Sequence, residues 1–311
     1  MLTFEQRYLC KLKYFRLMRS DIIFGVSSFR GNYKTLDRTS PRLRIQMNII
    51  RTSHRILSLM AQKVGSALPQ QVLLRVEKLA AAHQGKGVGM GSCDSEVEQC
   101  ANLLSAPPRV VLDVGGNRGD YSAAVRARFP HCEIHIFEPA PECATDLRRR
   151  FSGDAHIAVH EVALSNKTGE GTLWTDKPGS GLASLTRRKL EHFGLSMDQS
   201  RAVRTSRLDE LASACSLDRV DWIKIDVEGH ELAVLDGAST SLALVSLVQF
   251  EFGGCNIDTR TFFRDYWYLF TDLGFRLYRL TPWRPVPIQH YDEILEHFRT
   301  TNYVAVRSIH P

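Results

Sequence analysis

The chain is organised around the sequence Val110-Val111-Leu112-Asp113-Val114-Gly115-Gly116-Asn117-Arg118-Gly119-Asp120. Its apolar start predicts a short buried strand that carries a carboxylate near its end. Its glycines predict a tight turn, because glycine adopts positive φ and lets a ligand approach the backbone. Tyr121, Val125 and Phe129 follow at helical spacing, and the first turn of a helix offers unpaired N–H groups. The sequence therefore predicts a strand, a turn and a helix that together cradle a nucleotide.

The glycine spacing narrows the choice of nucleotide. Gly115 and Gly119 are spaced G-x-x-x-G, whereas a dinucleotide site requires G-x-G-x-x-G. Glu138 ends the next predicted strand, where its carboxylate can accept hydrogen bonds from both hydroxyls of a ribose. Asp113 is expected to organise the glycine loop or to receive an ammonium group. The spacing thus disfavours a dehydrogenase.

Strands and helices alternate along the rest of the chain. Such alternation predicts an α/β fold whose mostly parallel sheet is covered by helices on both faces, with ligands beyond the carboxyl ends of the strands. Strands are expected at 110–114, 133–138, 157–163, 220–226, 244–252, 275–280 and 303–306, with short ones at 169–174 and 203–205 in an insertion. Helices are expected at 4–18, 45–59, 71–82, 121–129, 141–151, 208–214, 231–235 and 261–273.

A second dense stretch reads Trp222-Ile-Lys-Ile-Asp-Val-Glu-Gly-His-Glu231. Strand alternation sends Lys224 and Asp226 to the face opposite Ile223 and Ile225. Asp226 or His230 could accept a proton from a substrate hydroxyl, or Asp226 and a second carboxylate could hold a divalent cation. A solvated turn before a helix is the simpler alternative. Ionisable groups at a strand end nevertheless indicate binding or catalysis.

The 311 residues fit one α/β domain and an extension, which we expect at residues 91–311 and 1–90. The formal charge is +6, but residues 1–60 alone carry twelve Lys or Arg and three Asp or Glu. The extension is therefore basic and is expected to be mainly helical. Its first helix could contact an anionic membrane, a nucleic acid, its own domain or a partner protein.

The sequence also indicates a compartment. No run approaches the roughly 18 apolar residues of a membrane span. The first residues lack a basic segment followed by an apolar one, so we expect a cytoplasmic protein. The seven cysteines include no C-x-x-C pair, so reduced thiols are expected, with neither disulfides nor a zinc site.

Four segments together resemble the FkbM family of S-adenosylmethionine-dependent methyltransferases, over about residues 110–280. They are Asp113-Val-Gly-Gly-Asn-Arg-Gly119-Asp-Tyr, Phe137-Glu138-Pro139, Val162-Ala163-Leu164-Ser165 and Ile223-Lys-Ile-Asp-Val-Glu-Gly-His-Glu231. The resemblance implies a class I methyltransferase (Rossmann-like) fold with a seven-stranded sheet whose last strand is antiparallel. It also implies methyl transfer to a hydroxyl of a carbohydrate or secondary metabolite. Gly116 stands where the family usually has alanine, and we expect that exchange to be tolerated.

The resemblance assigns roles to residues of this sequence. S-adenosylmethionine has a ribose, an ammonium, a carboxylate and no pyrophosphate, which suits the glycine spacing. Asp226 and His230 would flank the reacting hydroxyl, with Lys224 orienting Asp226 or balancing its charge. Adenine would pack near the end of the third strand. The cofactor would contact Asp113, Gly115, Gly116, Asn117, Gly119, Glu138, Ala163 and Leu164, and no metal is assigned.

Two other functions stay open at this point. The basic extension would suit an RNA methyltransferase, although nucleic acid is the less expected partner. A non-catalytic binding protein with the same fold is the alternative from another class. The chain lacks an Asp/Asn-Pro-Pro-Tyr/Phe segment after the fourth strand, which is the usual signature of amine methylation. Methyl transfer to oxygen is therefore preferred.

Overall fold

The computed structural model describes residues 69–87, 92–214 and 219–307. Gln71–Pro311 form one compact unit. The helix predicted at 71–82 is confirmed as α3 (Gln70–His83). The basic segment 1–60 and the helices predicted at 4–18 and 45–59 lie outside the described residues, and the domain boundary near residue 90 stays a prediction.

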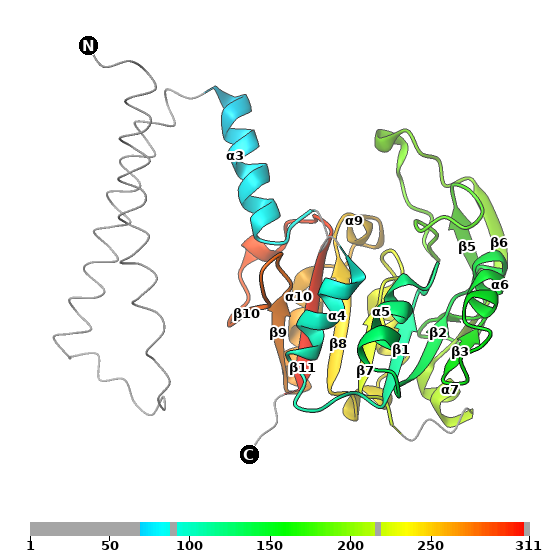
Figure 1. The fold of residues 1–311 in the computed structure, drawn as a ribbon. Coiled ribbons are helices and arrows are strands. Elements are labelled where there is room, and N and C mark those ends of the chain that lie inside the picture. The colour runs from blue at the N-terminus through cyan, green and yellow to red at the C-terminus, as the bar shows by residue number, and fades with distance from the viewer. Residues whose placement is uncertain (1–68, 88–91, 215–218, 308–311) are drawn as a thin grey trace, which may run out of the picture. The chain divides into compact units, whose positions relative to one another are not determined.

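A mostly parallel sheet forms the centre of the unit (Figure 1). Its strands lie in the order β10-β9-β11-β8-β7-β1-β2-β3. They are β1 (Val110–Val114), β2 (Glu133–Phe137), β3 (Ile157–His160), β7 (Trp222–Ile225), β8 (Leu247–Phe252), β9 (Phe275–Arg279), β10 (Val286–Ile288) and β11 (Thr301–Arg307). This confirms the α/β class and the mostly parallel sheet.

Among the described residues, the central sheet has eight strands, one more than the expected seven. β11 lies antiparallel between β8 and β9, as expected for the last strand. The extra strand, β10, pairs antiparallel with β9 at the edge of the sheet. No strand was predicted here because Pro285 and Pro287 lack the backbone N–H that hydrogen bonds between strands require. An edge strand can contain proline, because one side of it has no neighbouring strand to bond.

Helices cover both faces of the sheet. Successive residues of β1 point to opposite faces of the sheet. Val111 packs in the hydrophobic cluster on one face, and Leu112 packs in the cluster on the other. Within the described ranges, no helix is long and apolar enough to cross a bilayer. One face carries α4 (Cys93–Ala101), α5 (Asp120–Arg128) and α6 (Pro141–Arg150), and the other carries α7 (Leu208–Ala214), α8 (Glu231–Asp236) and α10 (Phe263–Asp272).

A small second sheet follows β3, in the order β4-β6-β5. The single strand predicted at 157–163 is wrong, because the chain turns at Glu161, where the Val162 N–H donates to the His160 carbonyl. β4 then pairs with β6. The loop between β5 and β6, residues 176–198, rises beyond the carboxyl ends of the central strands (Figure 1). The strands are β4 (Ala163–Leu164), β5 (Gly169–Thr175) and β6 (Gln199–Ser206).

Candidate active site

The turns after β1 and β7 form the floor of the site, which we define as residues 115–119 and 226–230. Gly115 has a φ of +85°, and a Cβ atom there would overlap the carbonyl oxygen of Asp226. The Gly115 N–H donates to the Phe137 carbonyl at 2.9 Å. Glycine is therefore required both for the backbone conformation and for the close approach. The two turns touch through their backbones.

Gly116 and Gly119, in the same turn, leave room for neighbouring buried side chains. A Cβ at Gly116 would overlap Cγ2 of the buried Ile136, so the glycine that stands where the family usually has alanine fits the packing of this chain. Gly119 has a φ of +79° at the start of α5, and a Cβ would lie 2.7 Å from the side chains of Leu147 and Phe151. Neither glycine lines the cleft described below.

Glu138 follows β2 and is 6% exposed. Its Oε2 accepts the Asn117 N–H, and its Oε1 accepts the Ala140 N–H, both at 2.8 Å. Burial raises the pKa of Glu138, and the two hydrogen bonds oppose that rise. The carboxylate is thus fixed in one orientation beside the glycine loop, with lone pairs left for hydroxyl donors.

A cleft opens beside Glu138, between the floor and the second sheet. Phe137, Leu173 and Leu185 supply apolar walls, and Ser180 and Ser184 add hydroxyls from the 176–198 loop. This mixture of one fixed carboxylate and apolar surfaces suits a nucleoside. The cleft brings together seven residues that the sequence predicted, namely Gly115, Asn117, Glu138, Ala163, Leu164, Asp226 and His230.

Asp113 does not line the cleft but lies fully buried below it. Its Oδ2 accepts the Ser122 hydroxyl at 2.6 Å, and Lys224 Nζ lies 3.7 Å from its Oδ1. Lys224 also lies 3.2 Å from Asp226 Oδ2. Burial lowers the pKa of Lys224, but the charges of Asp226 and Asp113 outweigh burial and raise it. The ammonium beside Asp113 is therefore that of Lys224, which balances the charge of Asp226.

The turn after β7 is held by Glu231, the first residue of α8. Glu231 is fully buried, and its Oε1 accepts the N–H groups of Val227 and Gly229 at 3.1 Å each. Burial raises the pKa of Glu231 to about 7. His230 Nε2 lies 2.9 Å from Ser165 Oγ at the edge of the cleft, and burial lowers its pKa.

The 176–198 loop contributes contacts that the sequence analysis did not find. The Ser184 hydroxyl donates to the Glu228 carbonyl at 2.9 Å, and the Arg188 guanidinium pairs with the Glu228 carboxylate. Glu228 itself has a left-handed φ of +56°. The loop has neither helical nor strand periodicity, so nothing in its sequence indicated that it would meet the turn after β7.

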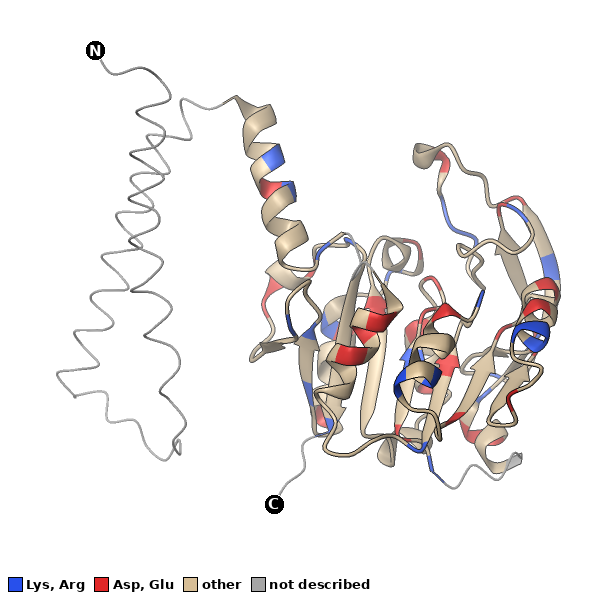
Figure 2. Cartoon of the chain, viewed as in Figure 1, with Lys and Arg blue, Asp and Glu red and all other residues tan. Residues whose placement is uncertain are grey.

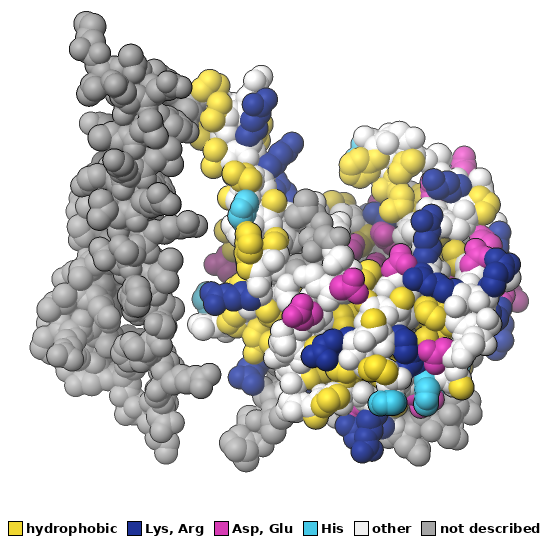
Figure 3. Space-filling view, in the orientation of Figure 1, with side chains coloured by type: hydrophobic (Ala, Val, Ile, Leu, Met, Phe, Trp, Pro, Cys, Tyr) yellow, Lys and Arg dark blue, Asp and Glu magenta, His cyan; other side chains and the backbone are white. Residues whose placement is uncertain are grey.

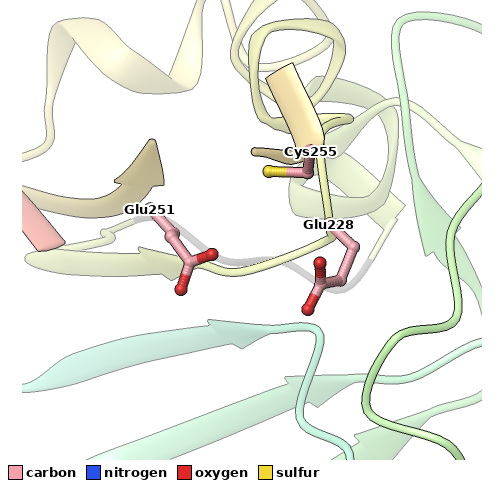
Figure 4. A group of neighbouring side chains, drawn as sticks. All are labelled: Glu228, Glu251 and Cys255. Carbon is pink, nitrogen blue, oxygen red and sulfur yellow. The ribbon is translucent and has the colours of Figure 1, made fainter. Parts of the chain in front are cut away.

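Acidic residues gather at the carboxyl ends of the central strands (Figure 2). Glu228, Glu251 and Cys255 offer ligand atoms within 4.8 Å of one another, from the turn after β7, from β8 and from α9 (Cys255–Thr259) (Figure 4). Such a group could hold a cation, but Arg188 already neutralises Glu228. Asp226 belongs to no group of this kind among the described residues.

The sequence matches known methyltransferases. Residues 113–277 match the profile of the methyltransferase FkbM domain. The 2-O-methyltransferase NoeI of Sinorhizobium fredii is 27% identical over 164 residues, which cover 50% of this chain and 67% of NoeI. Methyltransferase sdnD of Sordaria araneosa is 31% identical over 165 residues, or 44% of this chain and 62% of sdnD.

A third relative is the hexuronic acid methyltransferase AglP of Haloferax volcanii. It is 27% identical over 140 residues, which cover 45% of this chain and 54% of AglP. The alignments thus span between about half and two thirds of these relatives. The FkbM profile covers more than half of the present sequence and includes the glycine turn, Glu138 and the turn after β7. The chain therefore belongs to the FkbM methyltransferase family.

Proposed function

We propose that this protein is an S-adenosylmethionine-dependent O-methyltransferase that acts on a carbohydrate hydroxyl. Glu138 is the observation that carries the cofactor assignment. Its carboxylate is buried, is oriented by the N–H groups of Asn117 and Ala140, and lines a cleft with apolar walls. A ligand with paired hydroxyls and a flat apolar ring fits that combination.

The other residues of the cleft have complementary roles in this proposal. When bound, S-adenosylmethionine supplies an electrophilic methyl group on a positively charged sulfur. Ala163 and Leu164 would pack against adenine, and Gly115 lets the ligand approach the backbone. Asp226, whose side chain is 38% exposed, supplies negative charge on the same side. Lys224 is a positioning residue in this scheme, because it contacts Asp226 from below.

Two features support oxygen as the atom that is methylated. The names of two relatives specify 2-O-methyl transfer and a hexuronic acid, and a hydroxyl of a sugar fits both. The turn after β7 reads Asp226-Val-Glu-Gly and has no Pro-Pro pair of the kind used for amines. Asp226 and His230 are the groups of the cleft expected to flank the hydroxyl. Alignment of hydroxyl and methyl group and removal of the proton are the tasks left to the chain.

Calorimetric titration tests the cofactor assignment directly. We expect the purified protein to bind S-adenosylmethionine and S-adenosylhomocysteine and not NAD. Mass spectrometry should then detect a gain of one CH₂ on neutral or uronic acid oligosaccharides. Binding of NAD alone would overturn the cofactor assignment. Methyl transfer to RNA with none to sugars would support the alternative function and overturn the proposed acceptor.

A further inference from the structure

A second cavity of about 690 Å³ lies beyond the floor, on the far side of Glu228 from the cofactor cleft. Its volume falls in the range of about 300–1,000 Å³ that is usual for small-molecule sites. The space-filling view shows the surface hollowed beside the 176–198 loop, with acidic side chains in the hollow (Figure 3). Its lining includes Lys86, Leu182, Phe193, Glu228, Glu251 and Phe298.

Glu228 lines both the cleft and the second cavity, so the two spaces meet at this residue. Its position is fixed from the loop side, because Ser184 binds its carbonyl and Arg188 pairs with its carboxylate. An acceptor must reach the methyl group from outside the cofactor cleft. The second cavity provides an approach that ends at Glu228.

Glu251 differs from the other carboxylates around this junction. Asp226 contacts Lys224, Glu228 contacts Arg188, and Glu231 holds backbone N–H groups. Glu251 lines the second cavity, and its carboxylate has no hydrogen bond or ion pair to any described residue. Figure 4 shows its carboxylate beside that of Glu228. It is therefore the carboxylate that is free to receive a hydroxyl group.

Burial and neighbouring charges change the pKa of Glu251. Burial raises the pKa of Glu251 well above its ordinary value, and so do the charges of Asp226, Glu228 and Glu231, whereas Lys224 opposes the rise. A base with a raised pKa is more effective near neutral pH than an ordinary carboxylate.

Arg188 supplies an independent sign of a ligand in the same cavity. The residue is 9% exposed and lines the cavity, and its Nε–H has no hydrogen-bond partner among the described residues. Asp258 Oδ2 lies 3.8 Å from this atom, too far for a hydrogen bond. A buried guanidinium N–H without an acceptor is unfavourable, so an oxygen-rich ligand would satisfy it.

We propose that the second cavity is the acceptor site, that it takes a polyhydroxylated molecule, and that Glu251 accepts the proton of the hydroxyl that is methylated. The inference rests on the proposed function. The hydroxyl oxygen forms its bond to the methyl carbon while its proton moves to a Glu251 oxygen. The carbon–sulfur bond breaks, and its electron pair stays on the sulfur, which becomes neutral.

Glu251→Gln tests this role, with Glu133→Gln at the opposite end of the sheet as the matched control. Methyl glucoside, methyl glucuronide and maltotriose serve as acceptor probes. We expect Glu251→Gln to lower kcat about 100- to 10,000-fold with little change in KM and to remove the acidic limb of the pH–rate profile. Its affinity for S-adenosylmethionine should match that of the wild type. Glu133→Gln should behave as the wild type throughout.

The outcomes separate this inference from the proposed function. If the wild type fails to bind S-adenosylmethionine, the proposed function is wrong. If it binds the cofactor but none of the three sugars enters the S-adenosylhomocysteine complex in a calorimetric titration, the acceptor cavity is wrongly assigned. If Glu251→Gln keeps a kcat within threefold of the wild type, or keeps the acidic limb, Glu251 is not the base.

Discussion

Replacing Glu138 by glutamine tests the cofactor site with the smallest change in shape. The carboxylate oxygens each accept one backbone N–H at 2.8 Å, from Asn117 and from Ala140. Glutamine keeps one acceptor oxygen, but its NH₂ group must face one of these two N–H donors. The variant therefore both lacks a charge and places a donor against a donor.

The expected loss of affinity follows from these contacts. A hydrogen bond to a charged group contributes about 1.5–3 kcal/mol, and at least one such bond to a ribose hydroxyl would be lost. The glutamine NH₂ group that faces a backbone N–H adds to this loss. We therefore expect the binding free energy of S-adenosylmethionine to weaken by about 2–4 kcal/mol. This corresponds to an increase in Kd of about 30- to 700-fold.

Isothermal titration with S-adenosylmethionine and S-adenosylhomocysteine measures this change. Both ligands should weaken alike, because both carry the ribose. Glu133→Gln, at the exposed start of the same strand, should leave both affinities unchanged. If Glu138→Gln binds within threefold of the wild type while its thermal unfolding shows an intact fold, the reasoning about the ribose contact is refuted.

Two further predictions concern stability. Gly115→Ala should destabilise the protein by at least about 2 kcal/mol in urea unfolding, because the Cβ meets the Asp226 carbonyl, whereas Gly153→Ala, with nothing within 4 Å, should change it little. Equal effects of the two changes would contradict the backbone contact. The raised pKa of Glu231, about 7 against 4.5, means that the unfolded chain releases this proton first, so stability should fall as pH rises from 4.5 to 7. Glu231→Gln should flatten that fall, and an unchanged pH dependence would show that Glu231 does not cause it.

Local patterns predicted the part of the site that lies on strand ends. Glu138 and Asp226 end apolar runs, and parallel strands bring such ends to one edge of a sheet, so their convergence on one cleft followed from the sequence. Asp113 was harder to place, because it precedes the strand end by one residue. Its side chain contacts Ser122 of α5 and Lys224 and does not line the cleft.

The contacts around the second cavity could not be predicted in the same way. Arg188 and Ser184 contact Glu228 across 40 and 44 positions of sequence, from a loop without periodicity. Glu251 was visible as an acid in a strand, but no local pattern shows that its carboxylate, unlike those of the acidic residues described around it, has no hydrogen bond or ion pair. That property depends on the tertiary contacts of Lys224 and Arg188 with those neighbours.

The overlap that a Cβ at Gly115 would make with Asp226 also bears on how this architecture can change its substrate. The backbones of the two turns are in close contact there, so a change in the conformation of one turn would displace the other. The 176–198 loop is joined to the turn after β7 by side chains, among them Ser184 and Arg188. Under the proposed assignment, insertions or exchanges in that loop would alter the acceptor site and leave the methyl-donor site unchanged. New substrate specificities should arise, in evolution or in engineering, on the loop wall and not in the two turns.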